Sequence, residues 1–141
     1  MLKKTCSIRF PRLTTESIHV VTSNIGPILV ITGVLTALML AQFIAPEWMI
    51  HRVYGETMSG EATTGVARHW GLLLFCVGML LVYSAFHPVL RRPTVVIASI
   101  EKAGFVACVF GTSLRRSRIA SLMATGDAAM TLVYVLFLFG F

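Results

Sequence analysis

The sequence predicts an all-α integral membrane protein, a bundle of four transmembrane helices with a short interfacial helix in the first loop. Of its 141 residues, 56% are hydrophobic and only 13% are charged, whereas a soluble globular domain carries roughly 25% charged residues. Four segments also approach or reach the ~20 mostly apolar residues that a spanning helix needs. These spans are expected at about residues 25–45, 70–90, 93–111 and 119–139.

The spans and their loops account for nearly the whole chain, which leaves no room for a separate soluble domain. We therefore expect two parts, a basic N-terminal arm over residues 1–24 and a four-helix transmembrane domain over residues 25–141. The apolar run that follows the arm is longer than the apolar region of a cleaved signal peptide. The first span is thus expected to stay in the protein, with Ser23 or Asn24 as its N-cap and Pro27 in its first turn.

The segment after the first span predicts the interfacial helix. Residues 46–54 begin with Pro-Glu, mix aromatic, apolar and basic side chains, and are followed by Gly55. Such a segment is typical of a helix that lies in the headgroup zone of a membrane. Trp48 and Tyr54 would be its anchors, because Trp and Tyr are enriched at that depth.

The last three spans are bounded by basic and proline residues. The second opens with Arg68-His69-Trp70 and is expected to end at His87-Pro88, where Arg91-Arg92-Pro93 predicts a turn. Small residues that favour close helix packing recur in the third and fourth spans. These are Ala98, Gly104 and Cys108 in the third span and Ala120, Ala124 and Ala128 in the fourth. An alternative in which the third segment re-enters the membrane without crossing it remains open.

The net charge of +6 comes from basic residues at the span ends. This distribution predicts contact with anionic lipid headgroups and no nucleic-acid partner. With both termini in the cytoplasm, six Lys and Arg side chains lie inside and five lie outside, a small excess on the side that the positive-inside rule favours. We expect a bacterial cytoplasmic (inner) membrane protein with this orientation.

Three charged residues lie within the predicted spans. Glu101 and Lys102 are adjacent in the middle of the third, and Asp127 is near the middle of the fourth. A charge near the bilayer centre costs roughly 2.5–3.5 kcal/mol, so it normally faces a protein interior, a partner or a water-filled cavity. Adjacent helical side chains point about 100° apart, so Lys102 is expected to pair with Asp127. Arg68 or His69 would reach Glu101 if the second span is shifted.

No catalytic or metal-binding motif stands out. Cys6, Cys76 and Cys108 form no C-x-x-C pair, and the usual hydrolase and nucleotide-binding motifs are absent. The four histidines lie at or near span ends, where they are poorly placed to ligate a transmembrane haem. We therefore expect no resident cofactor, with quinone or haem as the alternatives.

The layout of the chain resembles that of the small four-helix DoxX-like membrane proteins. The resemblance rests on Ala45-Pro46-Glu47 after the first span, on Tyr54-Gly55, on Ala67-Arg68-His69-Trp70-Gly71, and on Asp127 in the fourth span. It covers roughly residues 25–141. The resemblance implies a four-helix bundle, and some DoxX-type proteins are subunits or partners of quinone-linked oxidoreductases.

The sequence thus favours a small accessory or ligand-binding membrane protein. Its polar site would be formed by Glu101, Lys102, Asp127 and Arg68, with His69 beside it, and its ligand would be a lipid or a quinone. One alternative is a proton-coupled transporter that uses Glu101 or Asp127, and another is a quinone- or haem-linked redox subunit. A larger membrane complex or a second copy of the chain would be the protein partner.

Overall fold

The computed structural model describes residues 24–139. The predicted basic arm, except for Asn24, and the last two residues lie outside this part. The described elements are the α-helices α2 (Ile25–Ala37), α3 (Leu40–Ile44), α4 (Pro46–Tyr54), α5 (Glu61–Phe86), α6 (Pro88–Gly111) and α7 (Arg118–Leu138), with a 3₁₀ turn η1 (Ser113–Arg116) before α7. The all-α prediction is confirmed within this range.

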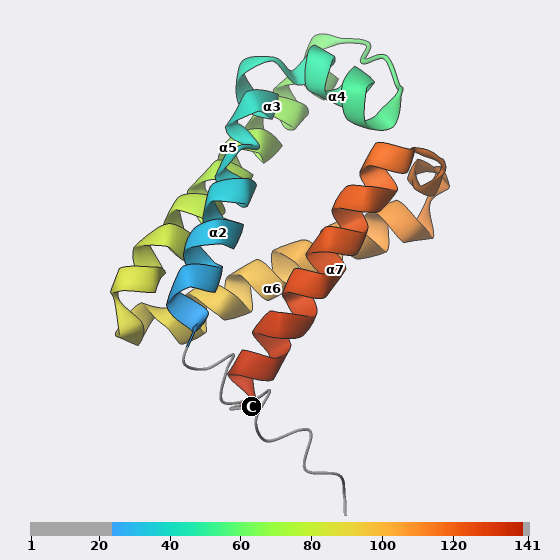
Figure 1. Ribbon diagram of the computed structural model, residues 1–141. Helices are drawn as coiled ribbons and strands as arrows, with labels where there is room; N and C mark the ends of the chain where they lie inside the picture. The colour runs from blue at the N-terminus through green and yellow to red at the C-terminus, as the bar shows by residue number, and fades with distance from the viewer. Residues whose placement is uncertain (1–23, 140–141) are drawn as a thin grey trace, which may run out of the picture.

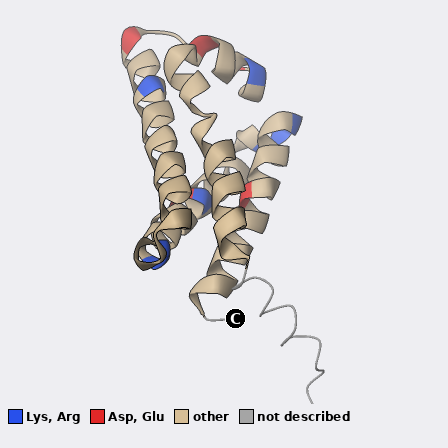
Figure 2. Cartoon of the chain, turned by 60° about the vertical axis from the view of Figure 1, so that its left-hand side comes forward, with Lys and Arg blue, Asp and Glu red and all other residues tan. Residues whose placement is uncertain are grey.

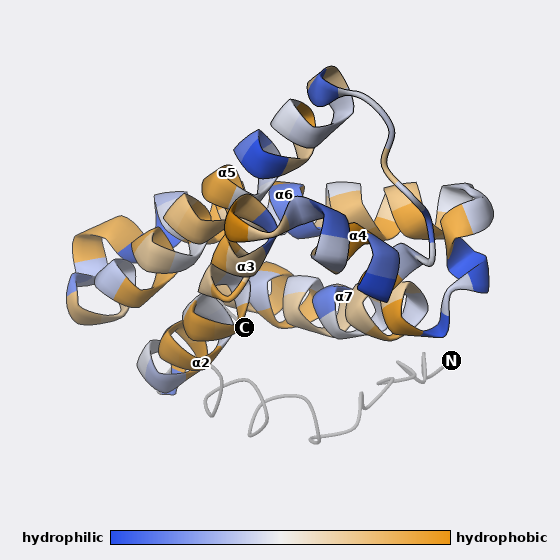
Figure 3. Ribbon diagram, turned by 90° about the horizontal axis from the view of Figure 1, so that it is seen from above, coloured by the Kyte–Doolittle hydropathy of each residue, from blue (hydrophilic) through white to orange (hydrophobic). Residues whose placement is uncertain are grey.

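Four helical segments are long and apolar enough to cross a membrane: α2 together with α3, then α5, α6 and α7. Most of their residues are hydrophobic, and many large hydrophobic side chains are exposed, whereas hydrophilic residues gather on α4 and at helix ends (Figure 3). Figure 2 shows most charged residues at the helix ends and a small group midway along the helices. The chain is an integral membrane bundle of four spans, as predicted.

The helices form two pairs that diverge from one end of the molecule. In Figure 1, α2 and α3 lie along α5, and α6 lies along α7. The pairs meet where α5 turns into α6, and α4 lies at the opposite end. The bundle therefore has two packed ends with a more open region between them.

Each end has its own hydrophobic core. One core lies at the α5–α6 turn and contains Ile25, Leu29, Leu81, Ala85, Val95, Ala98 and Tyr134. The other lies at the α4 end and contains Val53, Val109, Ala120 and Ala124. A hydrogen bond lies at each end: Tyr134 Oη of α7 donates to Thr32 Oγ1 of α2 at 2.5 Å and so joins the two helix pairs, and Ser117 Oγ, just before α7, donates to the carbonyl oxygen of Val53 in α4.

Glycines allow α2 and α5 to pack backbone to backbone. A Cβ atom added at Gly78 would lie 2.5 Å from the backbone nitrogen of Ala37, and one added at Gly33 would lie 2.7 Å from the carbonyl oxygen of Gly78. Only a residue without a side chain fits at such a separation.

The predicted small-residue stripes are only partly used. Ala98, Ala120 and Ala124 are buried, but Gly104, Cys108 and Ala128 are exposed. This difference from the prediction has a simple geometric cause, since the buried face of α6 follows Ala98, Lys102 and Val109 at helical spacing. Gly104 and Cys108 lie on other faces of α6, whereas Ala128 continues the stripe of Ala120 and Ala124 along α7 and is exposed.

The boundary between the second and third spans differs from the prediction. A single residue, His87, separates α5 from α6, and the expected turn at Arg91-Arg92-Pro93 lies inside α6. Arg91 explains how so short a connection is satisfied, because its guanidinium donates to the backbone carbonyls of Ala85 at 2.7 Å and Ser84 at 3.4 Å. Both are terminal carbonyls of α5, where few backbone donors follow; that of Ser84 also accepts from the backbone N–H of His87 at 3.2 Å.

Two further features of the spans bear on the predictions. The second span begins at Glu61, earlier than the predicted residue 70. The third is one unbroken helix of 24 residues, whereas a re-entrant segment would turn back within the membrane. The four-span reading therefore fits α6 better than the re-entrant alternative.

The short helix α4 occurs where it was predicted. Pro46 occupies its first turn, and Gly55 ends it with φ of 74°, a left-handed conformation that favours glycine. Trp48 is 63% exposed, as expected for an anchor in the headgroup zone. Tyr54 differs from that expectation, because its side chain lines a cavity between the helix pairs.

Candidate functional site

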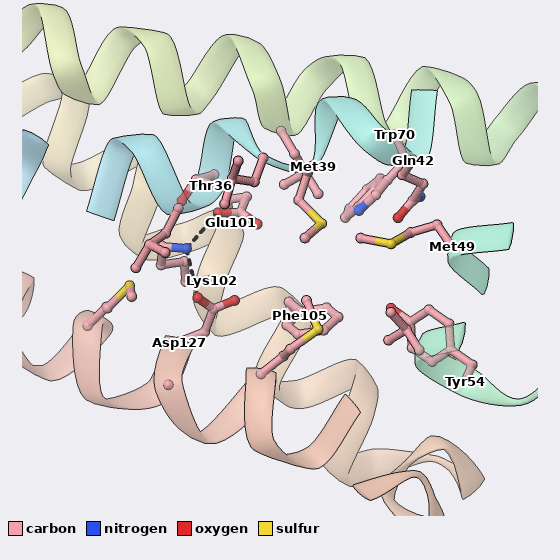
Figure 4. Close-up of a pocket in the computed structure, with 17 residues that line it drawn as sticks. Thr36, Met39, Gln42, Met49, Tyr54, Trp70, Glu101, Lys102, Phe105 and Asp127 are labelled. Atoms are coloured by element: carbon pink, nitrogen blue, oxygen red, sulfur yellow. Dashed lines mark hydrogen bonds and ion pairs between the residues drawn. The ribbon is translucent and has the colours of Figure 1, made fainter. Parts of the chain in front are cut away.

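A cavity of about 330 Å³ lies between the two helix pairs, and between the two hydrophobic cores. Every helix of the described chain contributes to its wall (Figure 4). The lining residues are Leu35, Thr36, Leu38, Met39 and Gln42 of the first span, Met49, Val53 and Tyr54 of α4, Trp70 and Leu74 of α5, Glu101, Lys102 and Phe105 of α6, and Met123, Gly126, Asp127 and Met130 of α7. This volume is in the range of small-molecule sites, roughly 300–1,000 Å³.

The three charged residues predicted from the sequence meet in this cavity. Lys102 Nζ donates to Asp127 Oδ1 at 2.8 Å, and lies 3.9 Å from Glu101 Oε2. Figure 4 shows the ammonium group between the two carboxylates. Lys102 is only 3% exposed. The expected pairing of Lys102 with Asp127 is thus present, and the contact between the adjacent Glu101 and Lys102 is the looser of the two.

The side chain of Glu101 is incompletely satisfied. Its Oε2 atom is buried and has no hydrogen-bond donor among the described residues. A buried acceptor without a donor costs free energy, more so for a carboxylate than for a neutral group. With all three groups ionised, the cluster carries one positive and two negative charges. The cluster therefore has one acceptor atom without a donor and, in this state, a net negative charge.

The rest of the wall is mostly apolar and adaptable. Four of the seven methionines of the chain line the cavity, Met39, Met49, Met123 and Met130. Methionine side chains are flexible and polarisable, so they adjust to irregular shapes. Trp70 and Phe105 add flat aromatic surfaces, against which ring systems and alkyl chains pack well.

The uncharged polar residues of the wall mostly bond the protein itself. Gln42 Nε2 donates to the carbonyl oxygen of Ala67 at 3.0 Å, and Thr36 Oγ1 donates to that of Thr32 at 2.8 Å. Tyr54 lies at the α4 end of the cavity, where burial, with a smaller contribution from Cys108, raises the pKa of its phenol. The phenol therefore stays protonated near neutral pH.

Arg68 and His69, which the sequence placed beside Glu101, do not lie in the cavity. Both are exposed, and Arg68 lines a separate surface hollow together with Glu47 and Glu61. The reason is the rotation of α5 about its axis. Its buried face follows Ala67 and Gly71, and residues 68 and 69 point away from it.

Several lining residues were not singled out from the sequence. Gln42 is the one side-chain amide in the first span, and the four lining methionines come from three segments, the first span, α4 and α7. These are weak signals, because methionine is common in membrane spans. Gly126 is a clearer case in hindsight, since it sits directly beside the intramembrane Asp127.

The described histidines lie away from this cavity. His51, His69 and His87 are exposed, and His87 Nδ1 lies 3.0 Å from the carbonyl oxygen of Tyr83. Within residues 24–139, no group of three or more His, Cys, Asp or Glu residues is arranged to hold a metal ion.

Comparison with known proteins gives no relative: no protein-family profile, no curated protein and no solved structure matches the chain significantly.

Proposed function

We propose that the protein binds one lipid-soluble amphipathic molecule in the cavity between its helix pairs. The observation that carries this proposal is the charged cluster of Glu101, Lys102 and Asp127 facing a cavity whose other walls are mainly apolar. A site of this kind has the usual composition of a small-molecule pocket, in which a few polar groups orient a largely apolar ligand.

The charged cluster also favours one kind of head group. Glu101 Oε2 offers a buried acceptor, and with all three groups ionised the cluster has an excess of negative charge. A head group that donates a hydrogen bond would satisfy the acceptor, whereas a carboxylate or phosphate would add to the repulsion. A hydroxyl-bearing lipid or a reduced quinone fits this description, and the methionine and aromatic walls suit its apolar part.

We also propose that the protein acts as an accessory subunit, in line with the resemblance of its layout to the DoxX-like membrane proteins. The bundle has no described soluble domain that could carry out chemistry on its own. A larger membrane complex would then receive or supply the bound molecule. The bacterial inner membrane and cytoplasmic termini form part of this proposal.

Proton-coupled transport is the second candidate, because Glu101 has an oxygen that no described residue bonds. Such a carboxylate can exchange a proton for a ligand. Reconstituted vesicles distinguish the two functions: a transporter acidifies or alkalinises the lumen when its ligand is added, whereas a binding subunit does not.

Tryptophan fluorescence provides the test of binding. The chain has two tryptophans, of which Trp70 lines the cavity and Trp48 does not. In a Trp48→Phe variant in lipid nanodiscs the remaining tryptophan of the chain is Trp70, which lines the cavity and is also 47% exposed, so probe dissolved in the bilayer gives a linear background and binding in the cavity adds a saturable component. The probe is ω-bromodecanol, whose bromine quenches tryptophan on close approach, and the matched control probe is bromodecane, which lacks the hydroxyl group.

We expect saturable quenching by the bromo-alcohol, relieved by a short-chain reduced quinone or by decanol, and only weak, linear quenching by bromodecane. Glu101→Leu should abolish the difference between the two probes, because it removes the acceptor. Arg92→Leu, at an exposed site outside the cavity, should leave it intact. Equal, linear quenching by both probes in the Trp48→Phe protein would contradict the proposal.

A further inference from the structure

The cavity lies between two long-range hydrogen bonds, one from α7 to α2 and one from the start of α7 to α4. Tyr134 bonds Thr32 near one end, and Ser117 bonds the carbonyl of Val53 near the other. Each bond lies at a packed hydrophobic core. Packed residues therefore lie beyond the cavity toward both ends of the bundle, which disfavours entry of a ligand along the bundle axis.

The side between the first span and α7 is built differently. On the first span, Leu35 and Leu38 line the cavity and are also 48% and 61% exposed. On α7, Met130 and Gly126 line it, and Gly126 is exposed. Residues that face both the cavity and the outside mark an opening. In a transmembrane bundle, this opening lies at the depth of the hydrocarbon core.

Gly126 has a particular place in this opening. A Cβ atom added there would meet nothing within 4 Å, so the glycine is not needed for close packing of helices. This sets it apart from Gly33 and Gly78, where an added Cβ would meet backbone atoms. Its small size leaves free space next to Asp127, at the point where a bound molecule would leave the charged cluster.

We propose that the ligand enters sideways from the bilayer, through a portal between the first span and α7, and that Gly126 keeps this portal open. This inference rests on the proposed function. It narrows the ligand to molecules that dissolve in the membrane. Their head would pass Leu35 and Gly126 to reach Lys102, Asp127 and Glu101, and their apolar tail would follow into the apolar part of the cavity beside Trp70.

The test compares two glycine substitutions of the same kind. Gly126→Leu places a branched side chain in the portal, whereas Gly104→Leu places one on an exposed face of α6 that does not line the cavity. An added Cβ meets no atom within 4 Å at either site, and both changes replace glycine inside a helix. Each is made in the Trp48→Phe protein, and quenching by ω-bromodecanol is followed by stopped flow.

We expect Gly126→Leu to slow the association rate by about tenfold or more while thermal stability is kept, because access to the site is narrowed. Gly104→Leu should bind at the parent rate. Met130→Phe, on the same wall, is the second variant and should also slow association if Gly126→Leu does not fold.

An unchanged association rate in both Gly126→Leu and Met130→Phe, with normal quenching, would overturn the portal and leave the binding function in place. Slowing by Gly104→Leu alone would overturn it as well, because the opening would then lie on the other side of α6. Absence of saturable quenching in the parent protein would overturn both the binding function and the portal.

Discussion

Lys102 is the only lysine of the chain outside the predicted N-terminal arm, and it is almost fully buried between two carboxylates. Such an arrangement stabilises the fold only while all partners are present. Removing one partner of a buried ion pair lowers the free energy of unfolding by about 3–5 kcal/mol, whereas replacing the whole pair by apolar groups often leaves it unchanged. The same ammonium group thus has a structural role besides its proposed contact with a ligand.

Lys102→Met is expected to lower the thermal stability of the protein in detergent, because Asp127 then loses the ammonium group that donates to its Oδ1 at 2.8 Å. Combining Lys102→Met with Asp127→Leu should recover part of the loss. Thermal unfolding of the two single variants and the double variant measures the coupling. If the two losses simply add, the residues do not act as a pair. Arg92→Met, at an exposed site, is the matched control.

For single residues, the sequence indicates which charged side chains lie at a similar depth in the membrane, but not which neighbouring helix each side chain faces. Lys102 and Asp127 could be paired because both lie near the middle of consecutive antiparallel spans. Arg68 was placed near Glu101 on a similar argument and lies elsewhere, because the rotation of α5 turns it outward. Rotation depends on how the whole helix packs, which no single residue reveals.

Among the elements, α2 and α5 form the closest contact of the described bundle, with glycines on both sides. Lipid tails are as apolar as helix side chains, so the hydrophobic effect does not drive helices together within a bilayer. Such contacts depend instead on van der Waals packing of closely approaching backbones. From the sequence, close helix packing was expected at small residues of the third and fourth spans. The glycines of the first and second spans, which make this contact, were not predicted. Spacing alone cannot say which of several small-residue faces meets a neighbour.

Gly78→Ala is expected to destabilise the protein by about 1–3 kcal/mol, because the added methyl group overpacks a filled interface. The new Cβ would lie 2.5 Å from the backbone nitrogen of Ala37, an atom that cannot move without the whole helix. Gly65→Ala, also in α5, is the control, since its Cβ would meet nothing within 4 Å. Thermal unfolding should place Gly65→Ala at or above the parent and Gly78→Ala clearly below it. The reverse order would argue against this interface.

The element boundaries show a second limit of the sequence. A pair of arginines followed by proline normally suggests a polar turn, and such a turn was expected at residues 91–93. The structure instead uses Arg91 to bond the last carbonyls of α5, so the turn shrinks to His87. A basic side chain that replaces missing backbone bonds looks, in sequence, like one that faces water.

For the whole molecule, the fold class and the number of spans follow from composition and segment length, which is why both could be predicted. The cavity could not, because it depends on how far the two helix pairs diverge. That divergence is fixed by the two hydrophobic cores and by the bonds of Tyr134 and Ser117 to residues far away in the sequence.

The arrangement of the spans predicts which positions share a membrane face. Glu61 at the start of α5 and Ser113 in η1 lie at the same end of the bundle, and His87 lies at the other (Figure 1). In a protein whose three native cysteines are replaced by serine, Glu61→Cys and Ser113→Cys should react with an impermeant maleimide from one side of sealed cells, and His87→Cys should not. Labelling of Glu61→Cys and Ser113→Cys from opposite sides would contradict four crossings.

The single-residue connection at His87 has a consequence for biosynthesis. Because only His87 separates α5 from α6, no loop can remain in water after α5 has inserted and before α6 has been synthesised. We therefore do not expect the two spans to insert one after the other. We expect α5 and α6 to partition into lipid together as a helical hairpin, with Arg91 already bonded to the last carbonyls of α5. Lengthening this connection by a few residues would let the two helices insert separately, and would allow the translocation machinery to choose an orientation for each.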